Sequence, residues 1–388
     1  MEKSAAKKGL PAFIGVAAVW MGTHFGPGLA SGTQINVYYV NYGIPGICVT
    51  ALAMGLLGYV LYCSMEFSRI YKTYDYHSWT RELYGTQWAV YLFDLIFLVT
   101  ILTALGGSLN AVAVLLENFV GLNYWVGVSL VIACGMLLCA YGAELVRRAS
   151  TYMMFLIGGI LLVIMLLVVI QGDPDLAGSI ANQRTNLPTV SWGAALWSAV
   201  IYASFQATVV ANIASVADTL EDRAASKKAA LTGWIGNTVF LLILGLTLFS
   251  YTNVYNITAE ALPFFSILQR LGYDWLSGVY ITIVFVAVLS TVVGFSFAGV
   301  ARFSKYYRSK EEGANHSLRD GLFVGALLLG CAAASRFGIV ALVSVGYRLL
   351  GYLNLPIIML PAIILGGKKI SKEYLRKEGI KAPGVSFD

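Results

Sequence analysis

Long apolar windows separated by short polar segments dominate the 388-residue chain. Each window is long enough for a helix to cross about 30 Å of hydrocarbon, and several are long enough to be tilted or broken. The first window follows a basic start but runs well past a signal-length core, so we expect it to remain as the first span. The ten windows lie at about 11–40, 44–70, 86–117, 124–143, 150–171, 190–217, 229–252, 274–303, 318–336 and 338–366. The pattern predicts an all-α polytopic membrane protein with ten transmembrane helices.

Composition agrees with this pattern. Hydrophobic residues make up 58% of the chain and charged residues 12%, whereas soluble domains carry about 25% charged residues. The cysteines all fall in apolar segments, without ligand-like spacing beside histidines or carboxylates. We therefore expect packing thiols, with no disulfide and no zinc site. The five cysteines are Cys48, Cys63, Cys134, Cys139 and Cys331.

The distribution of positive charge predicts the orientation of the chain. With the N-terminus in the cytoplasm, 22 of the 26 Lys and Arg residues fall on the inner side. Arg184, Arg270 and Arg336 fall on the outer side, and Arg348 lies inside the last span. This asymmetry follows the positive-inside rule and supports an N-in and C-in topology. It also explains the net charge of +6 without a nucleic-acid partner, so we expect a multi-pass protein of the inner (cytoplasmic) membrane that binds no nucleic acid.

Short motifs indicate an internal repeat. The inner loop SWTRELYGTQW (78–88) and the outer loop ALPFFSILQRLGYDW (261–275) each end in Gly-x-x-Trp, on opposite predicted sides of the membrane. Because an odd-numbered unit repeated in tandem inserts upside down the second time, ten spans suggest a 5+5 inverted repeat. The predicted units are 1–171 for the first repeat, 190–366 for the second and 367–388 for a basic cytoplasmic tail.

The first helix of each predicted half is irregular. The first span carries GTHFGPGLASG (22–32), and the sixth carries YASFQATVVANIAS (202–215), a polar interruption at the same depth. Paired discontinuous helices expose backbone amides and carbonyls that can hold a solute or an ion. The alternative is a pair of glycine-rich packing seams. The density of glycine together with Pro27 favours a break in the first span.

These features resemble the LeuT-type fold of the amino acid–polyamine–organocation superfamily. FGPGLASGTQ (25–34) and the segment 198–234 are similar to the uncharacterised bacterial YkvI-type membrane proteins, and the architecture agrees over nearly the whole chain. The resemblance implies alternating access, with spans 1, 2, 6 and 7 moving against spans 3, 4, 8 and 9. One departure is Thr33-Gln34, where that group is expected to have Gln-Glu. Loss of the acid puts in doubt a cation-binding or proton-carrying role at that position.

The resemblance also implies a sodium site. Sodium-coupled members hold the ion with oxygens from two helices. Helix 1 supplies two carbonyls at its break, and helix 8 supplies one carbonyl and two hydroxyls that follow it three and four positions later. Neutral oxygens suit a monovalent cation, although Ser and Thr also satisfy carbonyls within membrane helices. Apart from this coupling ion, we expect no cofactor. The matching positions are Gly22, Phe25, Ala287, Ser290 and Thr291.

The irregular segments also predict a solute site. The amides of the helix that begins near Gly28, with the positive end of its dipole, suit a carboxylate. None of the candidate solute-binding residues is an acid, which disfavours polyamines and divalent metals as solutes. We therefore expect a small zwitterion such as an amino acid. The candidate solute-binding residues come from spans 1, 3 and 6: Thr23, His24, Gly26, Gly28, Ser31, Gly32, Gly107, Asn110, Tyr202, Ser204, Phe205 and Gln206.

A few ionisable residues lie within or near the spans. His24 is the single histidine at membrane depth; it could carry a proton or bind the solute, or it could cap a carbonyl freed at the break. For Asp94 and Arg348 we expect structural ion pairs or gating contacts. Glu66, near an inner helix end, is expected to pair with nearby basic residues, and His77 in an inner loop is expected to have no specific role.

The sequence therefore predicts a sodium-coupled secondary active transporter of a small polar solute, an amino acid or similar zwitterion. The alternative is a proton-coupled transporter of an amine or nucleobase-like solute that uses His24. A channel would need a wider polar stripe than the sequence has. No H-E-x-x-H, G-x-S-x-G or nucleotide loop is present, so we expect no enzyme. The expected partners are the solute and the lipid bilayer; a monomer is plausible, although the sequence does not decide the oligomeric state.

Overall fold

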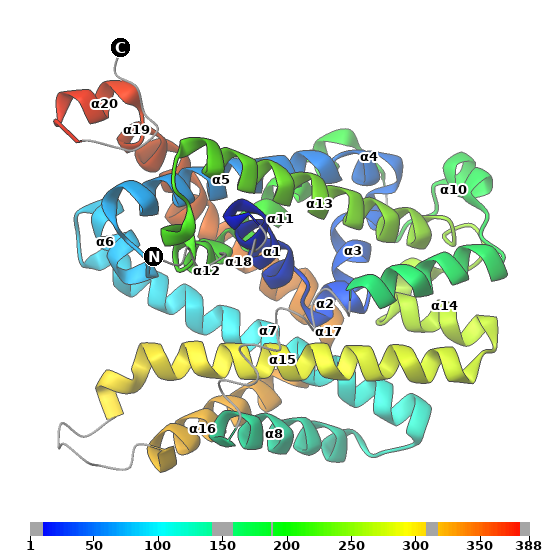
Figure 1. Ribbon diagram of the computed structural model, residues 1–388. Helices are drawn as coiled ribbons and strands as arrows, with labels where there is room; N and C mark the ends of the chain where they lie inside the picture. Colours follow the sequence, from blue (N-terminus) through cyan, green and yellow to red (C-terminus); the bar gives the residue numbers. More distant parts are fainter. Residues whose placement is uncertain (1–10, 142–157, 188, 308–316, 381–388) are drawn as a thin grey trace, which may run out of the picture.

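The computed structural model describes residues 11–141, 158–187, 189–307 and 317–380, and these ranges contain helices but no strand (Figure 1). By length and composition, six helices in these ranges can cross a membrane, or seven if the bent pair Gly158–Gln171 and Leu176–Asn182 forms one span. Each of the ten predicted windows contains helix within the described residues. The prediction of an all-helical membrane protein is confirmed. Parts of the predicted windows and tail, at 142–157 and 381–388, lie outside the described residues.

The first half of the chain begins with a broken helix and continues with longer ones. Its helices are α1 (Ala12–His24), α2 (Pro27–Ala30), α3 (Thr33–Tyr38), a 3₁₀ turn (Val40–Tyr42), α4 (Gly43–Cys48), α5 (Thr50–Tyr71), α6 (Tyr76–Tyr84), α7 (Trp88–Val120), α8 (Tyr124–Tyr141), the segment Gly158–Gln171 and α10 (Leu176–Asn182).

The second half has a similar succession of elements. Its helices are α11 (Trp192–Gln206), a 3₁₀ turn (Ala207–Val209), α12 (Val210–Ala214), a 3₁₀ turn (Ala217–Thr219), α13 (Arg223–Phe249), a 3₁₀ turn (Ile257–Ala259), α14 (Pro263–Leu271), α15 (Asp274–Tyr307) and α16 (Ser317–Ser335). The chain ends with α17 (Ile339–Ala341), a π-helical turn (Leu342–Gly346), α18 (Tyr347–Asn354), two further π-helical turns (Leu355–Met359 and Ala362–Gly366), α19 (Gly367–Lys369) and α20 (Lys372–Lys377).

The long helices pack in two groups. In the first group, α13 packs against α1 and α5, and α11 packs against α5. In the second group, α7, α8, α15 and α16 contact one another. Helix α18 lies between the groups, since it contacts both α11 and α7. The first group contains predicted spans 1, 2, 6 and 7, and the second contains spans 3, 4, 8 and 9.

Two short amphipathic helices, α6 and α14, lie at opposite ends of this bundle (Figure 1). Each has nine residues and ends at a glycine with positive φ, Gly85 at 69° and Gly272 at 73°, as glycine-terminated helices do. Each leads into a very long helix, α7 with 33 residues and α15 with 34. Trp88 and Trp275 lie at the starts of these helices and are 77% and 63% exposed, as expected for aromatic side chains at a membrane interface. We call the two ends of the bundle the α6 end and the α14 end.

Candidate functional site

The first predicted span is broken near its middle. Helix α1 ends at His24, and Gly26 is extended with φ −85° and ψ 171° before α2 begins at Pro27. Proline is favoured at the first position of a helix, because the N–H that it lacks would have no helical partner there. The Gly26 amide instead closes the break locally by donating to the His24 carbonyl over 2.9 Å. The structure therefore has the interruption that the sequence predicts.

A second bend, not predicted from the sequence, follows within about one turn. Helix α2 has only four residues, and Gly32 after it has φ 83° and ψ −9°, a conformation that glycine adopts without a steric penalty. A Cβ at Gly32 would lie 3.0 Å from the ring of Phe264, so space as well as backbone angle requires glycine. The available signal was the glycine itself, since helices often end at glycine. Beyond the bend, the side chain of Gln34 lies against Gly28.

The interruption of the sixth span is milder than expected. Helix α11 passes through the 3₁₀ turn at Ala207–Val209 into α12, and the path Trp192–Ala214 stays helical. The predicted interruption, 202–215, contains neither glycine nor proline, so nothing in it forces the backbone to unwind. The predicted discontinuity is therefore corrected to a locally tightened turn.

His24 joins three helices at the break. Its Nδ1 lies 2.6 Å from Oδ1 of Asn237 on α13, and its Nε2 lies 2.7 Å from the Tyr202 hydroxyl on α11. The Asn237 amide nitrogen donates to the Gly233 carbonyl over 2.8 Å, so its oxygen must accept from His24 Nδ1–H. His24 Nε2 then accepts from Tyr202 O–H, and a neutral ring is fully hydrogen-bonded. This geometry favours a structural link over the carbonyl cap considered from the sequence.

The other candidates on the sixth span form an aromatic and hydrogen-bonded layer. The Phe205 ring stacks on Tyr347 with a centroid distance of 4.8 Å and on Tyr38 at 5.7 Å. The Ser204 hydroxyl donates to the Gly351 carbonyl over 2.7 Å, and Gln206 is buried. Phe205 is therefore packed between the rings of Tyr347 and Tyr38, and its role as an aromatic lid stays a prediction.

The α14 end of the first span is covered by the chain that precedes and begins α14. Thr33 Oγ1 donates to the Ala261 carbonyl over 2.7 Å, and the Phe264 amide donates to the Ser31 carbonyl over 3.3 Å. From α15, the Tyr280 hydroxyl donates to the Ala30 carbonyl over 2.9 Å. These bonds join the first span to the start of α14 and to α15.

Several candidate residues are already engaged elsewhere. Asn110 donates to the Ser335 carbonyl over 3.1 Å and accepts from the Ile339 amide over 2.9 Å, so it ties α7 to the turn between α16 and α17. A Cβ at Gly107 would face Ile339 and Leu342, which places it against the same turn. The exposed Thr23 hydroxyl donates to carbonyls of its own helix. Asn110 and Gly107 therefore face the turn between α16 and α17, and the Thr23 hydroxyl stays bonded to its own helix.

The predicted sodium ligands divide between two elements. On α15, the Thr291 hydroxyl donates to the Ala287 carbonyl over 2.9 Å, so two of the predicted ligands are bonded to each other. On α1, the Gly22 carbonyl accepts from the Phe25 amide over 3.2 Å. The fifth predicted ligand, Ser290, also lies on α15. Within the described residues, no three or more His, Cys, Asp or Glu side chains are grouped as metal ligands.

Asp94 and Arg348, predicted to form ion pairs, behave differently. Asp94 pairs with Arg302 on α15 and accepts from the Tyr76 hydroxyl over 2.9 Å. Arg302 Nη1 lies 2.7 Å from Nδ1 of His77, so the expectation that His77 has no specific role is wrong. Arg348 donates to the Tyr42 hydroxyl over 3.4 Å and forms no ion pair with a described residue. The polar segment that faces it, TQINVYYVNY (33–42), contains no acid.

Glu66 lies in a second charged cluster at the α6 end. It is fully buried and accepts from Arg69 over 2.7 Å, from Arg223 over 2.9 Å and from Ser226 over 3.1 Å. Arg223 also donates to the Ile370 carbonyl over 2.5 Å. The expected pairing of Glu66 is confirmed, and it connects α5, α13 and the chain after α19.

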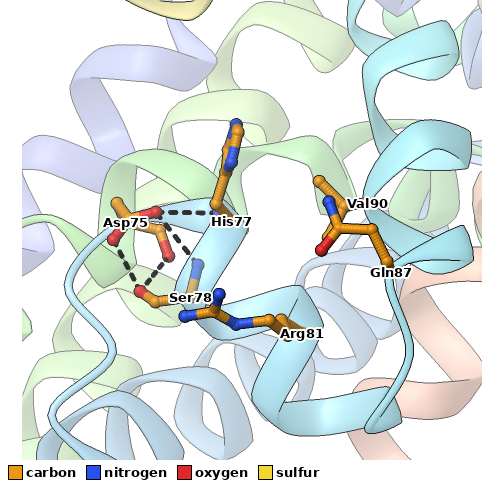
Figure 2. Close-up of a pocket in the computed structure, with 6 residues that line it drawn as sticks. All are labelled: Asp75, His77, Ser78, Arg81, Gln87 and Val90. Carbon is orange, nitrogen blue, oxygen red and sulfur yellow. Dashed lines mark hydrogen bonds between the residues drawn. The ribbon is translucent and has the colours of Figure 1, made fainter.

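A surface cavity of about 230 Å³ lies at the α6 end, away from the break. Figure 2 shows that its walls come from α6 and the start of α7. Asp75 caps α6 by accepting from the amides of His77 and Ser78. Burial by itself would raise the pKa of the Asp75 carboxyl, but these bonds and one from the Ser78 hydroxyl outweigh it and hold the pKa below its ordinary value. The lining residues are Asp75, His77, Ser78, Arg81, Gln87 and Val90.

Comparison with solved structures defines the fold. MhsT in complex with L-phenylalanine aligns with a TM-score of 0.65 at 15% identity, over 96% of this chain and 92% of that chain. A Na⁺-coupled sialic acid symporter in a substrate-bound outward-open state gives 0.60 at 14% identity, over 92% and 79%. Mhp1 in an inward-facing conformation gives 0.57 at 15% identity, over 93% and 78%. The chain therefore has the LeuT fold, and these structural relatives are transporters, not enzymes.

In sequence, the chain is similar to the uncharacterized membrane protein YkvI of Bacillus subtilis (strain 168). The two are 21% identical over 344 residues, which cover 88% of this chain and 92% of YkvI. No protein-family model matches the chain. Together with the apolar helices, the similarity identifies a multi-pass membrane protein, and the predicted resemblance to YkvI-type proteins is confirmed.

Proposed function

We propose that the chain is a secondary active transporter that moves a small zwitterionic solute, such as an amino acid, by alternating access. The observation that carries the proposal is the break at Phe25–Gly26 in the first helix of a LeuT fold. Irregular backbone at membrane depth is tolerated where it lines a cavity or is buried in protein, and such breaks form the binding sites of transporters. The buried rings of Tyr202 and Phe205 beside it suit a solute with an apolar part.

The proposed membrane arrangement is ten spans in a 5+5 inverted repeat, N-in and C-in, in the cytoplasmic membrane. Its units are 1–171, 190–366 and the tail 367–388. The two pairs α6–α7 and α14–α15, alike in length and glycine cap but at opposite ends, support an inverted repeat. The two packed groups of helices would be the bodies that move against each other.

Sodium is the proposed coupling ion, as in the sialic acid symporter whose structure this chain resembles. The ion would be held by the five predicted oxygens on α1 and α15. The Thr291 hydroxyl donates its proton to the Ala287 carbonyl here, and each of the two oxygens keeps at least one lone pair. Both oxygens would present these lone pairs to the ion.

The second candidate is a proton-coupled transporter that acts through His24. It is favoured by the burial of an ionisable ring, 2% exposed, at the break. Against it, both ring nitrogens already have hydrogen-bond partners. A proton entering the ring would have to displace Tyr202 as donor.

Uptake of the twenty radiolabelled L-amino acids into proteoliposomes tests these proposals. We expect at least one amino acid to accumulate when an inward sodium gradient is imposed. Ser290→Ala combined with Thr291→Val should abolish the response to sodium, whereas Thr282→Val, an exposed threonine on the same helix, should leave it intact. Uptake driven by a proton gradient and indifferent to sodium would support the second candidate, and unchanged sodium dependence in the double variant would contradict the ion site.

A further inference from the structure

Gln34 carries a buried amide that the proposed mechanism leaves unused. It is the second residue of α3, just beyond the second bend, and its side chain is 5% exposed. Its Oε1 is enclosed and has no hydrogen-bond partner, and no described residue bonds its amide nitrogen. A buried amide without partners is costly, and more so at membrane depth, where water does not compensate. A hydrogen-bond donor from a bound molecule would satisfy this oxygen.

The hydroxyls of Ser31 and Thr33, which precede Gln34 in the chain, do not share this feature. Ser31 Oγ donates to the Gly28 carbonyl over 3.1 Å, and Thr33 Oγ1 donates to the Ala261 carbonyl. These hydroxyls fasten the bend to the rest of the chain. Gln34 is therefore the one of these three polar side chains that is free to bind a ligand.

The backbone next to Gln34 makes room for its amide. A Cβ at Gly28 would lie 3.1 Å from Cγ and Cδ of Gln34 and 3.3 Å from its Nε2. These distances are shorter than ordinary van der Waals contacts, so a larger residue at position 28 would push the amide away. Glycine at position 28 thus keeps the Gln34 amide against α2, one turn from the first break.

We propose that Gln34 is a specificity-determining residue of the solute site, and that its Oε1 accepts a hydrogen bond from an N–H group of the solute. The inference rests on the proposed transport function and deepens it. An uncharged amide oxygen accepts from an ammonium or an amide N–H without adding a negative charge that would attract divalent metals. The favoured solutes are therefore zwitterions or neutral molecules with an N–H donor.

The test uses purified full-length protein and a thermal-shift titration with each of the twenty L-amino acids and with its des-amino carboxylic acid. Wild type should bind at least one amino acid and discriminate against the analogue without the amino group. Gln34→Leu should weaken binding of that amino acid by about ten- to a hundredfold, as for loss of one hydrogen bond to a charged donor. The same variant should bind the amino acid and its des-amino analogue equally well. Gln34→Glu, which keeps an acceptor oxygen, should retain the discrimination.

Two controls separate this role from a structural one. Gln87→Leu makes the same change at an exposed position and should leave binding unchanged. Without solute, Gln34→Leu should unfold at the same temperature as wild type or higher, because it removes an unsatisfied amide. If wild type binds an amino acid and Gln34→Leu binds it with the same affinity, the inference about Gln34 is overturned while the proposed transport function stands. If no amino acid shifts wild type, the proposed amino-acid transport fails and the inference fails with it.

Discussion

At the scale of single residues, His24 shows how structure selects among roles that sequence leaves open. A histidine at membrane depth is compatible with proton transfer, solute binding or capping of a carbonyl. The partners that decide the matter, Asn237 and Tyr202, are 213 and 178 positions away in the chain. No local pattern marked Asn237, which looks like any other polar residue within an apolar helix.

Asn237→Ala should lower the free energy of unfolding by about 1–3 kcal/mol, because it leaves the buried Nδ1–H of His24 without an acceptor. The measurement is the thermal unfolding midpoint in detergent. Asn212→Ala, the same change at an exposed position, serves as the control and should have little effect. If both variants unfold at the same temperature, the bond between His24 and Asn237 contributes nothing to stability.

At the scale of elements, the first span combines one predicted interruption with one that was not predicted. Gly26 and Pro27 predict the first interruption, because proline is favoured at the start of a helix and disrupts a helix that continues from the preceding turn. The bend at Gly32 depends also on Phe264, whose ring occupies the space where a Cβ would lie. In the sixth span the polar side chains of 202–215 predicted an unwound segment, but this segment, which has neither glycine nor proline, is helical.

Gly32→Ala should destabilise the protein by at least about 1–2 kcal/mol, the cost of placing an L residue in the left-handed region, with an additional clash against Phe264. Gly26→Ala is the matched control, because Gly26 has a negative φ and a Cβ there would meet nothing within 4 Å. Thermal midpoints of the two variants in detergent give the comparison. Equal midpoints would show that the second bend relaxes at no cost.

At the scale of the whole molecule, two charged clusters stand at the α6 end, one within each group of helices. Glu66 with its arginines ties α5 to α13, and Asp94 with Arg302 ties α7 to α15. Neither ion pair crosses from one group to the other. Each ion pair therefore joins helices within one group, an arrangement that suits the proposed alternating access.

The proposed inverted repeat predicts opposite accessibility for two equivalent positions. Thr86 and Tyr273 are both exposed, and each directly follows the glycine that ends α6 or α14. In intact cells a membrane-impermeant maleimide should label Tyr273→Cys strongly and Thr86→Cys only after permeabilisation. The wild-type chain, with its native cysteines, gives the background signal. Equal labelling of both variants in intact cells would contradict the inverted arrangement.

The sequence by itself determined the all-helical membrane character, the positions of the apolar windows and the break before Pro27. These properties depend on hydrophobic length and on the backbone limits of glycine and proline, which are local. The tertiary structure alone decided that His24 is held by Asn237 and Tyr202, that Asp94 pairs with Arg302, and that Gln34 is buried without a partner. Those outcomes depend on which side chains meet across helices that are distant in the chain. Hydrophobic patterning specifies the face that a helix buries, but not the helix that packs against that face.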